Sequence, residues 1–192
     1  MKRIILASGS PRRKELLEQC GVRPEIIASD INEYVSYKNT PEETAMSLSF
    51  QKAIDVASKA GDGIVIGADT LVVLEDEILG KPLNDKEAFS MLLKLSGKKH
   101  RVITGFSIID LAGPTKIVEY ESTDVYFREL SEIEISDYIS TGESDDKAGA
   151  YGIQGKGALL VEKIEGCYFN VMGLPISRLN SSLKLFFNLN LL

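Results

Sequence analysis

The sequence predicts an α/β domain built around a mixed, twisted β-sheet with flanking helices. Strand-like apolar runs alternate along the chain with helix-like runs, which is typical of α/β folds. Two strand-like stretches, at 101–111 and 116–127, follow each other without an intervening helix, which favours an antiparallel pair within that sheet. The length of 192 residues suits a single domain, expected to span 1–192.

The N-terminal segment predicts a strand that breaks sharply into a helix. Ile4–Ala7 is apolar, Ser10 can serve as the N-cap, and Pro11 fits the first helical position. Arg12 and Arg13 follow in the first turn, beside free backbone N–H groups and the positive end of the helix dipole. This combination predicts a phosphate-sized anion site at the carboxyl end of a strand, where ligands bind in open α/β sheets.

The later helices are predicted mainly from their N-terminal signals. Thr40 and Ser131 each begin a capping box, and Asn84 opens a third helix. The helices expected after the first one (11–20) span about 41–60, 84–96, 131–140 and 175–187.

The other strands are short. Ile26–Ile27 suggests one strand, and the almost wholly apolar run 63–67 predicts a central strand that ends at Ala68–Thr70. A hairpin is expected within 71–79, and the last strand is expected at 158–164.

Composition and charge exclude several classes of protein. With a net charge of −6 and a pI of about 5.0, Lys and Arg form no basic stripe of the kind that binds nucleic acid. The apolar run after Lys2 and Arg3 is too short for a signal peptide, and no segment approaches a membrane span. Cys20 and Cys167 have no metal-type spacing and predict free thiols in a reducing compartment. We therefore expect a cytoplasmic protein that binds a small phosphorylated ligand, with no nucleic-acid or membrane partner.

Two carboxylates are candidates for chemistry. Asp69, at the expected end of a buried strand and followed by Thr70, can hold a metal ion or polarise a water. The alternative is a carboxylate that caps a turn. Glu33 lies in a polar loop with Asp30 and Asn32 and could share a divalent cation with Asp69. A solvated loop charge is the alternative for Glu33.

Two lysines are candidates for anion binding. At about 100° per residue, Lys52 falls within the apolar stripe of the helix expected after Thr40, so its ammonium must meet an anion or extend past the helix edge. Lys81 follows a glycine and precedes Pro82, which stiffens that loop, although a surface lysine is the plain alternative. His100, the only histidine, is interpreted as a hydrogen-bonding structural residue, with a catalytic imidazole as the alternative.

The stretch 141–157 predicts a loop with a recognition role. Its five glycines allow the backbone to approach a flat ligand closely. Gln154 offers both a donor and an acceptor, which suits the edge of a nucleobase, and Lys147 adds charge for a phosphate. A flexible surface loop is the alternative. The P-loop, Rossmann and nucleophile-elbow motifs are all absent.

Five motifs stand in a fixed order: SGSPRR at 8–13, GADT at 67–70, GKP at 80–82, GKKHRVITG at 97–105 and DKAGAYGIQG at 146–155. Through these motifs the chain resembles the Maf family of nucleoside triphosphate pyrophosphatases, which is named for an association with septum formation. The resemblance implies an inosine triphosphatase-like mixed α/β fold with two lobes around a central cleft. It also implies hydrolysis between the α- and β-phosphates to a nucleoside monophosphate and pyrophosphate, with a divalent metal cation (Mg²⁺ or Mn²⁺).

The resemblance further implies residue roles. Asp69 corresponds to the proton acceptor, and Glu33 and Asp69 are the expected metal ligands. The expected phosphate-binding residues are Ser8, Arg13, Lys52 and Lys81. Within the family, an arginine, a threonine and a glutamine mark the branch that prefers dTTP and UTP, and they are present here as Arg12, Thr70 and Gln154.

Three functions compete at this point. The first is hydrolysis of dTTP, UTP and modified pyrimidine nucleotides, by a chain for which the resemblance makes a homodimer the expected assembly. The second is a nucleotide-binding regulator of cell division that acts through a protein partner, and the third is nucleotidyl transfer to an acceptor other than water. The intact set of Asp69, Glu33, Lys52 and Lys81 favours the enzyme, because a binding protein would be free to lose it.

Overall fold

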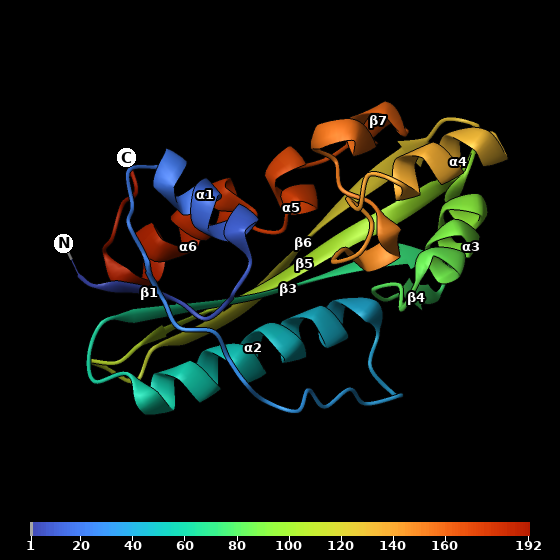
Figure 1. Ribbon diagram of the computed structural model, residues 1–192. Coiled ribbons are helices and arrows are strands. Elements are labelled where there is room, and N and C mark those ends of the chain that lie inside the picture. Colours follow the sequence, from blue (N-terminus) through green and yellow to red (C-terminus); the bar gives the residue numbers. More distant parts are fainter. Residues whose placement is uncertain (1) are drawn as a thin grey trace. The chain divides into compact units, whose positions relative to one another are not determined.

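The computed structural model describes residues 2–192 and confirms a mixed α/β fold (Figure 1). Within these residues, one seven-stranded sheet runs in the order β2-β1-β3-β5-β6-β7, and β4 pairs with β3. The strands are β1 (Ile4–Leu6), β2 (Glu25–Ile26), β3 (Ile64–Leu74), β4 (Glu77–Leu79), β5 (Lys99–Asp110), β6 (Lys116–Phe127) and β7 (Val161–Glu165). The helices are α1 (Pro11–Gln19), α2 (Pro41–Lys59), α3 (Asp85–Leu95), α4 (Glu132–Ile139), α5 (Tyr168–Met172) and α6 (Ile176–Phe187).

The sheet combines both strand orientations. β1 pairs in parallel with β2 and with β3, whereas the β3–β4 and β6–β7 pairs are antiparallel. The strands predicted within 101–127 are β5 and β6, which are neighbours in the sheet. The mixed sheet expected from the sequence is therefore confirmed.

The chain divides into two compact units. Unit 1 comprises Met1–Asp69, Thr104–Glu121 and Gly173–Leu192, and unit 2 comprises Thr70–Ile103 and Ser122–Met172. The strands β3, β5 and β6 each contribute one part to unit 1 and the other part to unit 2.

In unit 1, α2 packs against one face of the sheet, and α1 and α6 lie on the opposite face (Figure 1). The core beneath α2 joins helix residues to strand residues of β1, β3 and β5. Its buried members are Ile5, Ala7, Ala53, Val56, Val65 and Ile109. Two strand glycines, Gly67 and Gly105, let α2 approach closely, because a Cβ at either position would overlap backbone atoms of the helix.

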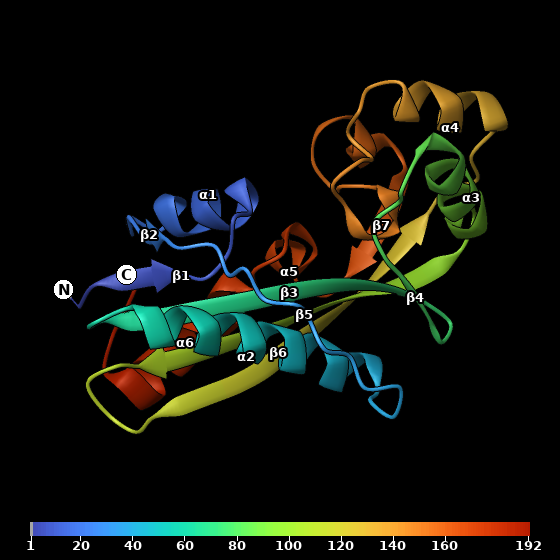
Figure 2. The ribbon, with the colours of Figure 1, turned by 60° about the horizontal axis from the view of Figure 1, so that its bottom comes forward.

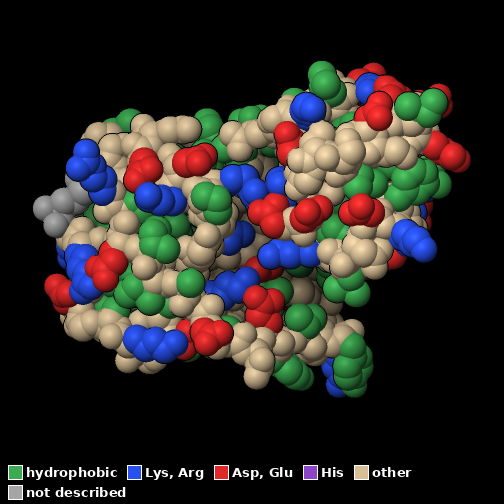
Figure 3. All heavy atoms as spheres, in the orientation of Figure 1, with side chains coloured by type: hydrophobic (Ala, Val, Ile, Leu, Met, Phe, Trp, Pro, Cys, Tyr) green, Lys and Arg blue, Asp and Glu red, His purple; other side chains and the backbone are tan. Residues whose placement is uncertain are grey.

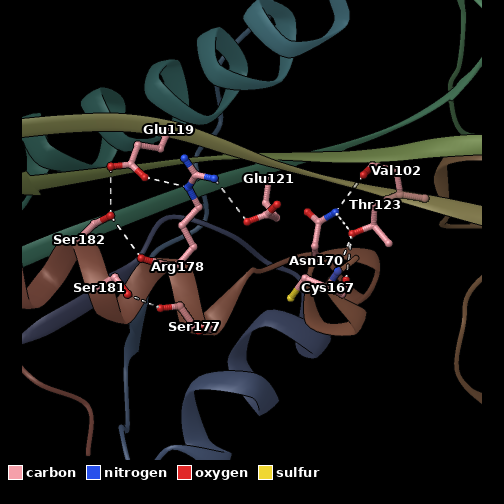
Figure 4. Close-up of polar contacts among 10 residues, drawn as sticks. All are labelled: Val102, Glu119, Glu121, Thr123, Cys167, Asn170, Ser177, Arg178, Ser181 and Ser182. Atoms are coloured by element: carbon pink, nitrogen blue, oxygen red, sulfur yellow. Dashed lines mark hydrogen bonds and ion pairs between the residues drawn. The ribbon is translucent and has the colours of Figure 1, made fainter. Parts of the chain in front are cut away.

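Helix α6 of unit 1 is attached to strand β6 by polar side chains. Arg178 on α6 pairs with Glu119 (3.0 Å) and Glu121 (3.5 Å) on β6, as Figure 4 shows. Ser182, one turn further along the helix, donates to Glu119 at 3.1 Å. These contacts fix the last helix to strand β6.

In unit 2, α3 and α4 contact each other and enclose the second core. The short helix α5 is held by polar contacts, which Figure 4 also shows. Asn170 donates from Nδ2 to the Val102 carbonyl and to Thr123 Oγ1, both at 2.9 Å. Thr123 Oγ1 in turn accepts the Cys167 N–H at 3.0 Å. A buried amide thus ties the segment before α6 to strands β5 and β6.

The structure differs from the sequence prediction at several places. The short helix α5 has no counterpart among the predicted helices. β3 does not end at Ala68–Thr70 but continues without interruption to Leu74. Ser10 occupies the N-cap position of α1, yet its side chain makes no capping hydrogen bond. The last strand begins at Val161 rather than at residue 158, because 3₁₀ turns at Ala148–Ala150 and Gly155–Leu159 extend the irregular stretch.

Figure 2 presents the same elements from a second direction, with α2 in front of the sheet. None of the helices described is both long enough and apolar enough to cross a membrane.

Candidate active site

The candidate site residues of unit 1 come from four segments of the chain: the β1–α1 turn, the loop before α2, α2 itself and β3. They are Ser8, Arg12, Arg13, Glu33, Lys52 and Asp69. Ion pairs connect the loop, α2 and β3, and Arg13 interacts electrostatically with the two carboxylates involved.

Asp69 and Lys52 meet because of strand alternation. Side chains along β3 alternate between the two faces of the sheet, so Val65, Gly67 and Asp69 share the face covered by α2. Lys52 Nζ contacts Asp69 Oδ1 directly. The two side chains are 18% and 13% exposed, so the pair is largely shielded from water. The ion pair explains why β3 continues past Asp69 and Thr70: the Asp69 carboxylate finds a cationic partner while its backbone stays in the strand.

Glu33 reaches the same ammonium group. Its Oε1 lies 2.9 Å from Lys52 Nζ, although Glu33 is 36 residues from Asp69 along the chain, as the numbering shows, and belongs to the loop before α2. One cation therefore brings two carboxylates together. The expected lysine within the apolar stripe of α2 meets anions and does not extend into solvent.

The β1–α1 turn is built around a buried hydroxyl. Ser8 Oγ accepts from the Arg13 guanidinium at 2.9 Å and from the Ser10 N–H at 3.3 Å. Arg13 also donates from Nε to the Gly173 carbonyl at 2.8 Å. The guanidinium is thus held on two sides, which fixes its direction.

The charges of unit 1 interact with each other. Burial lowers the pKa of the Arg13 guanidinium, the Asp69 carboxylate raises it, Arg12 lowers it further and Glu33 raises it. Arg13 therefore lies within electrostatic range of Arg12, Glu33 and Asp69. With Lys52, the three cations outnumber the two carboxylates, which favours an anionic ligand.

The two carboxylates fit a magnesium or manganese site of the kind that substrate completes. Among the residues described there is no group of three or more His, Cys, Asp or Glu side chains that could hold a metal ion. Mg²⁺, however, is commonly bound by one or two carboxylates, with waters and substrate phosphates as the other ligands. Glu33 and Asp69 already converge on a cation, the Lys52 ammonium, so this donor set is suitable.

The remaining candidates belong to unit 2. Thr70 follows Asp69 in β3 and is half-buried, while Lys81 is exposed in the loop after β4. Gln154 is exposed at the start of a 3₁₀ turn. Glu143 stabilises that turn, because its carboxylate accepts the N–H groups of Lys156 (3.1 Å) and Gly157 (3.3 Å).

His100 is a structural residue, as the sequence suggested. Its Nε2 lies 2.6 Å from the Tyr151 hydroxyl, and its ring packs edge-on against Phe127 and Tyr151. Burial lowers the pKa of His100 to about 4, with Asp124 acting in the opposite direction. The ring thus contacts Tyr151, which belongs to the same irregular stretch as Gln154.

Comparison with known proteins identifies the family. A family model described as "Maf-like protein" matches residues 3–186. This chain belongs to the Maf family. A Maf relative from Clostridioides difficile (strain 630) is 54% identical over 188 residues, which cover 98% of this chain and 97% of that protein. A relative from Alkaliphilus oremlandii (strain OhILAs) is 55% identical over 193 residues and covers both chains completely. Both are named dTTP/UTP pyrophosphatase.

The solved structures include distant neighbours. One is the Staphylococcus aureus Ham1 protein, at 17% sequence identity and a TM-score of 0.48, which covers 66% of this chain and 72% of that chain. The fold of this Maf chain is assigned to the mixed α/β class from its own strand order and not from that neighbour.

Sequence reasoning missed the residues that support this Maf site. Gly173, Gln51 and Glu143 each hold a candidate residue or its loop through hydrogen bonds. The Gly-Leu-Pro turn at 173–175 is a sequence signal that could have drawn attention to Gly173. Gln51 and Glu143 carry no such signal, because their partners lie more than ten residues away.

Proposed function

We propose that this Maf protein hydrolyses dTTP and UTP between the α- and β-phosphates, and releases the nucleoside monophosphate and pyrophosphate. The observation that carries the proposal is the convergence of Glu33 and Asp69 on Lys52, with Arg13 in electrostatic range. The relatives' name, dTTP/UTP pyrophosphatase, supports the substrates. The alternative of a binding-only regulator is not favoured, because these relatives are named for catalysis.

Glu33 and Asp69 would hold the divalent cation, which supplies positive charge to the phosphate oxygens when it is bound. Arg13 and Lys52 bind the oxygens of the triphosphate and stabilise the charge that develops on them. Ser8 keeps the Arg13 guanidinium in place, since it already accepts a hydrogen bond from it. Lys81 is proposed as a further phosphate-binding residue on the basis of the GKP motif.

In the chemical step, a water oxygen forms a bond to phosphorus while the bridging P–O bond of the anhydride breaks. Asp69 accepts a proton of that water, and the leaving group, which is pyrophosphate when the α-phosphorus is attacked, takes the electron pair of the broken bond. The partial shielding of Asp69 from solvent strengthens its interaction with nearby cations.

Base selection is proposed for Arg12, Thr70 and Gln154. The matching residues of the dTTP- and UTP-preferring branch support this role, as does the donor and acceptor pair of the Gln154 amide. We further propose that the enzyme acts in the cytoplasm on nucleoside triphosphates, modified pyrimidines included, and that it forms a homodimer, which sedimentation would test.

The first test is product analysis after incubation with dTTP, UTP and GTP in the presence of Mg²⁺. We expect pyrophosphate with dTMP and UMP, and little product from GTP. Orthophosphate in place of pyrophosphate would contradict the bond assignment.

The Asp69→Asn variant tests the proton acceptor. We expect a loss of turnover of about 10²-fold or more, because the amide cannot take the proton, while nucleotide binding survives. Turnover above a few per cent of the wild-type value would refute the role of Asp69. Nucleotide binding, measured by calorimetry, is the control for correct folding.

A further inference from the structure

The segment that carries Glu33 packs on the core only at its first residue, where the partly buried Ile27 contacts the core beneath α2. Between β2 and α2, residues 27–40 contain no buried residue. The apolar side chains that follow Glu33 are exposed, since Tyr34 is 71%, Val35 50% and Tyr37 92% exposed. Around Glu33 the hydrophobic effect therefore does little to determine where the segment lies, and polar contacts must do so.

These polar contacts are made by one stripe of α2. Ser47, Gln51, Asp55 and Lys59 follow one another at intervals of four residues, which places them on the same side of the helix. Asp55 accepts the Ser29 hydroxyl at 2.9 Å and the Asp30 N–H at 3.4 Å, and Lys59 pairs with it at 2.7 Å.

Gln51 makes the second attachment, to the backbone of Tyr34. Its Oε1 accepts the Tyr34 N–H at 2.9 Å, and its Nε2 donates to the Tyr34 carbonyl at 2.8 Å. Nε2 also donates to Ser47 Oγ at 3.1 Å. The amide thus uses its acceptor and both N–H donors, which only glutamine or asparagine can supply.

Adjacent residues of α2 therefore hold adjacent residues of the loop. Gln51 binds the Tyr34 peptide groups, and Lys52 binds the Glu33 carboxylate. The backbone contact sets the distance from which the Glu33 side chain reaches the ammonium.

We propose that Gln51 and Asp55 are positioning residues that hold the Glu33 carboxylate beside Lys52 and Asp69 and thereby determine the affinity for the divalent cation. This inference rests on the proposed function, in which Glu33 is a metal ligand. It assigns neither residue a contact with substrate.

The test compares Gln51→Ala and Gln51→Glu with Gln19→Ala and Gln19→Glu. Gln19 is an exposed glutamine of α1, so its variants carry the same chemical changes away from the loop. Two readouts are independent of catalysis: hydrogen exchange of the Tyr34 amide, and the affinity for Mn²⁺ alone, measured from the electron paramagnetic resonance signal of free Mn²⁺. Asp55→Ala is a second variant, since it removes the other attachment.

We expect faster exchange at Tyr34 in both Gln51 variants, and an affinity for Mn²⁺ reduced by about tenfold in Gln51→Ala, because residues that orient metal ligands typically contribute that much. Gln51→Glu should show the faster exchange of the two, since it loses both donors and places a carboxylate against the Tyr34 carbonyl. Its negative charge, however, favours Mn²⁺ and should make its loss of affinity the smaller one. Asp55→Ala should act in the same direction. The ratio of kcat/KM for dTTP and GTP, and the melting temperature relative to the Gln19 variants, should not change.

Unchanged Mn²⁺ affinity in the Gln51 and Asp55 variants would overturn the inference if Glu33→Gln weakens Mn²⁺ binding. Unchanged affinity in Glu33→Gln would instead refute Glu33 as a metal ligand, and would overturn the inference together with that part of the proposed function. An equal loss of affinity in the Gln19 variants would assign the effect to charge or stability and would also overturn it.

Discussion

At the scale of the residue, Lys52 organises the charges of unit 1. Its stem lies among residues of α2 that are fully or nearly fully buried, while its ammonium contacts Asp69 and Glu33. A lysine in such a position is costly unless it finds anions, and here it finds two. The same two carboxylates, once they face a divalent cation, would leave the ammonium available for a phosphate.

Gln154→Ala tests base selection. The glutamine is exposed and belongs to a turn that Glu143 stabilises, so its removal should leave the fold intact. We expect the ratio of kcat/KM for dTTP to that for GTP to fall by about tenfold, with a smaller effect on turnover. Measuring kcat/KM for dTTP, UTP, CTP and GTP checks this, and an equal loss on all four would contradict the role.

His100 should make stability depend on pH. Its pKa is about 4 in the folded protein against 6.5 as the ordinary value, so the unfolded chain binds more protons between these two values. The free energy of unfolding is therefore unaffected by titration of His100 above about pH 6.5. It falls as the pH is lowered from about 6.5 to about 4, by about 3 kcal/mol in total.

Urea unfolding between pH 7 and pH 4 measures this loss. His100→Gln should show a smaller decrease in the free energy of unfolding over that range, because glutamine does not titrate there. An identical decrease in the variant would exclude His100 as the source.

At the scale of the element, α2 both packs on the sheet of unit 1 and carries side chains that hold the candidate site residues. One face packs on β3 and β5 over Gly67 and Gly105, and the neighbouring stripe holds the loop with Glu33. The glycines let the helix approach closely enough for Lys52 to reach a strand residue. Helix packing and the position of the charges are therefore coupled.

Gly105→Ala tests this close approach. A Cβ would overlap the Ala45 carbonyl of α2, so the helix must shift. We expect the free energy of unfolding to fall by about 1–3 kcal/mol, as for other overpacked cores. Gly113→Ala is the matched control, since nothing lies within 4 Å of its Cβ. Equal stabilities of the two variants in urea would contradict the expectation.

At the scale of the whole molecule, charge determines which partners are attracted. The net charge is −6, and on the face shown in Figure 3 Lys and Arg side chains lie among Asp and Glu side chains. Arg13 and Lys52, which interact with Glu33 and Asp69, form a local cluster of positive charge. A small polyanion such as a triphosphate suits a local cluster, whereas duplex DNA requires an extended one.

We therefore expect no binding of a random DNA duplex tighter than about 100 µM at physiological salt. Fluorescence anisotropy of a labelled duplex measures this affinity. Saturable binding at micromolar concentrations would contradict the expectation, and dTTP with Mg²⁺ is the positive control for an active preparation.

Much of the fold follows from local signals in the sequence. The capping boxes at Thr40 and Ser131 form as predicted, and the helices begin where those signals place them. β3 is the main exception. The polar pair Asp69–Thr70 suggests a strand end, but the Asp69 carboxylate is satisfied by Lys52, a partner that local sequence does not reveal.

The sequence by itself determined most of the order of strands and helices, though not α5, and its five motifs indicated the Maf family. These features depend on residues that are close together in the chain. Only the tertiary structure decided that Glu33 and Asp69 share one ammonium, that Gly173 holds Arg13, and that Gln51 holds the loop before α2. These contacts join residues that are distant in the chain, and their geometry depends on how closely a helix can pack against a sheet.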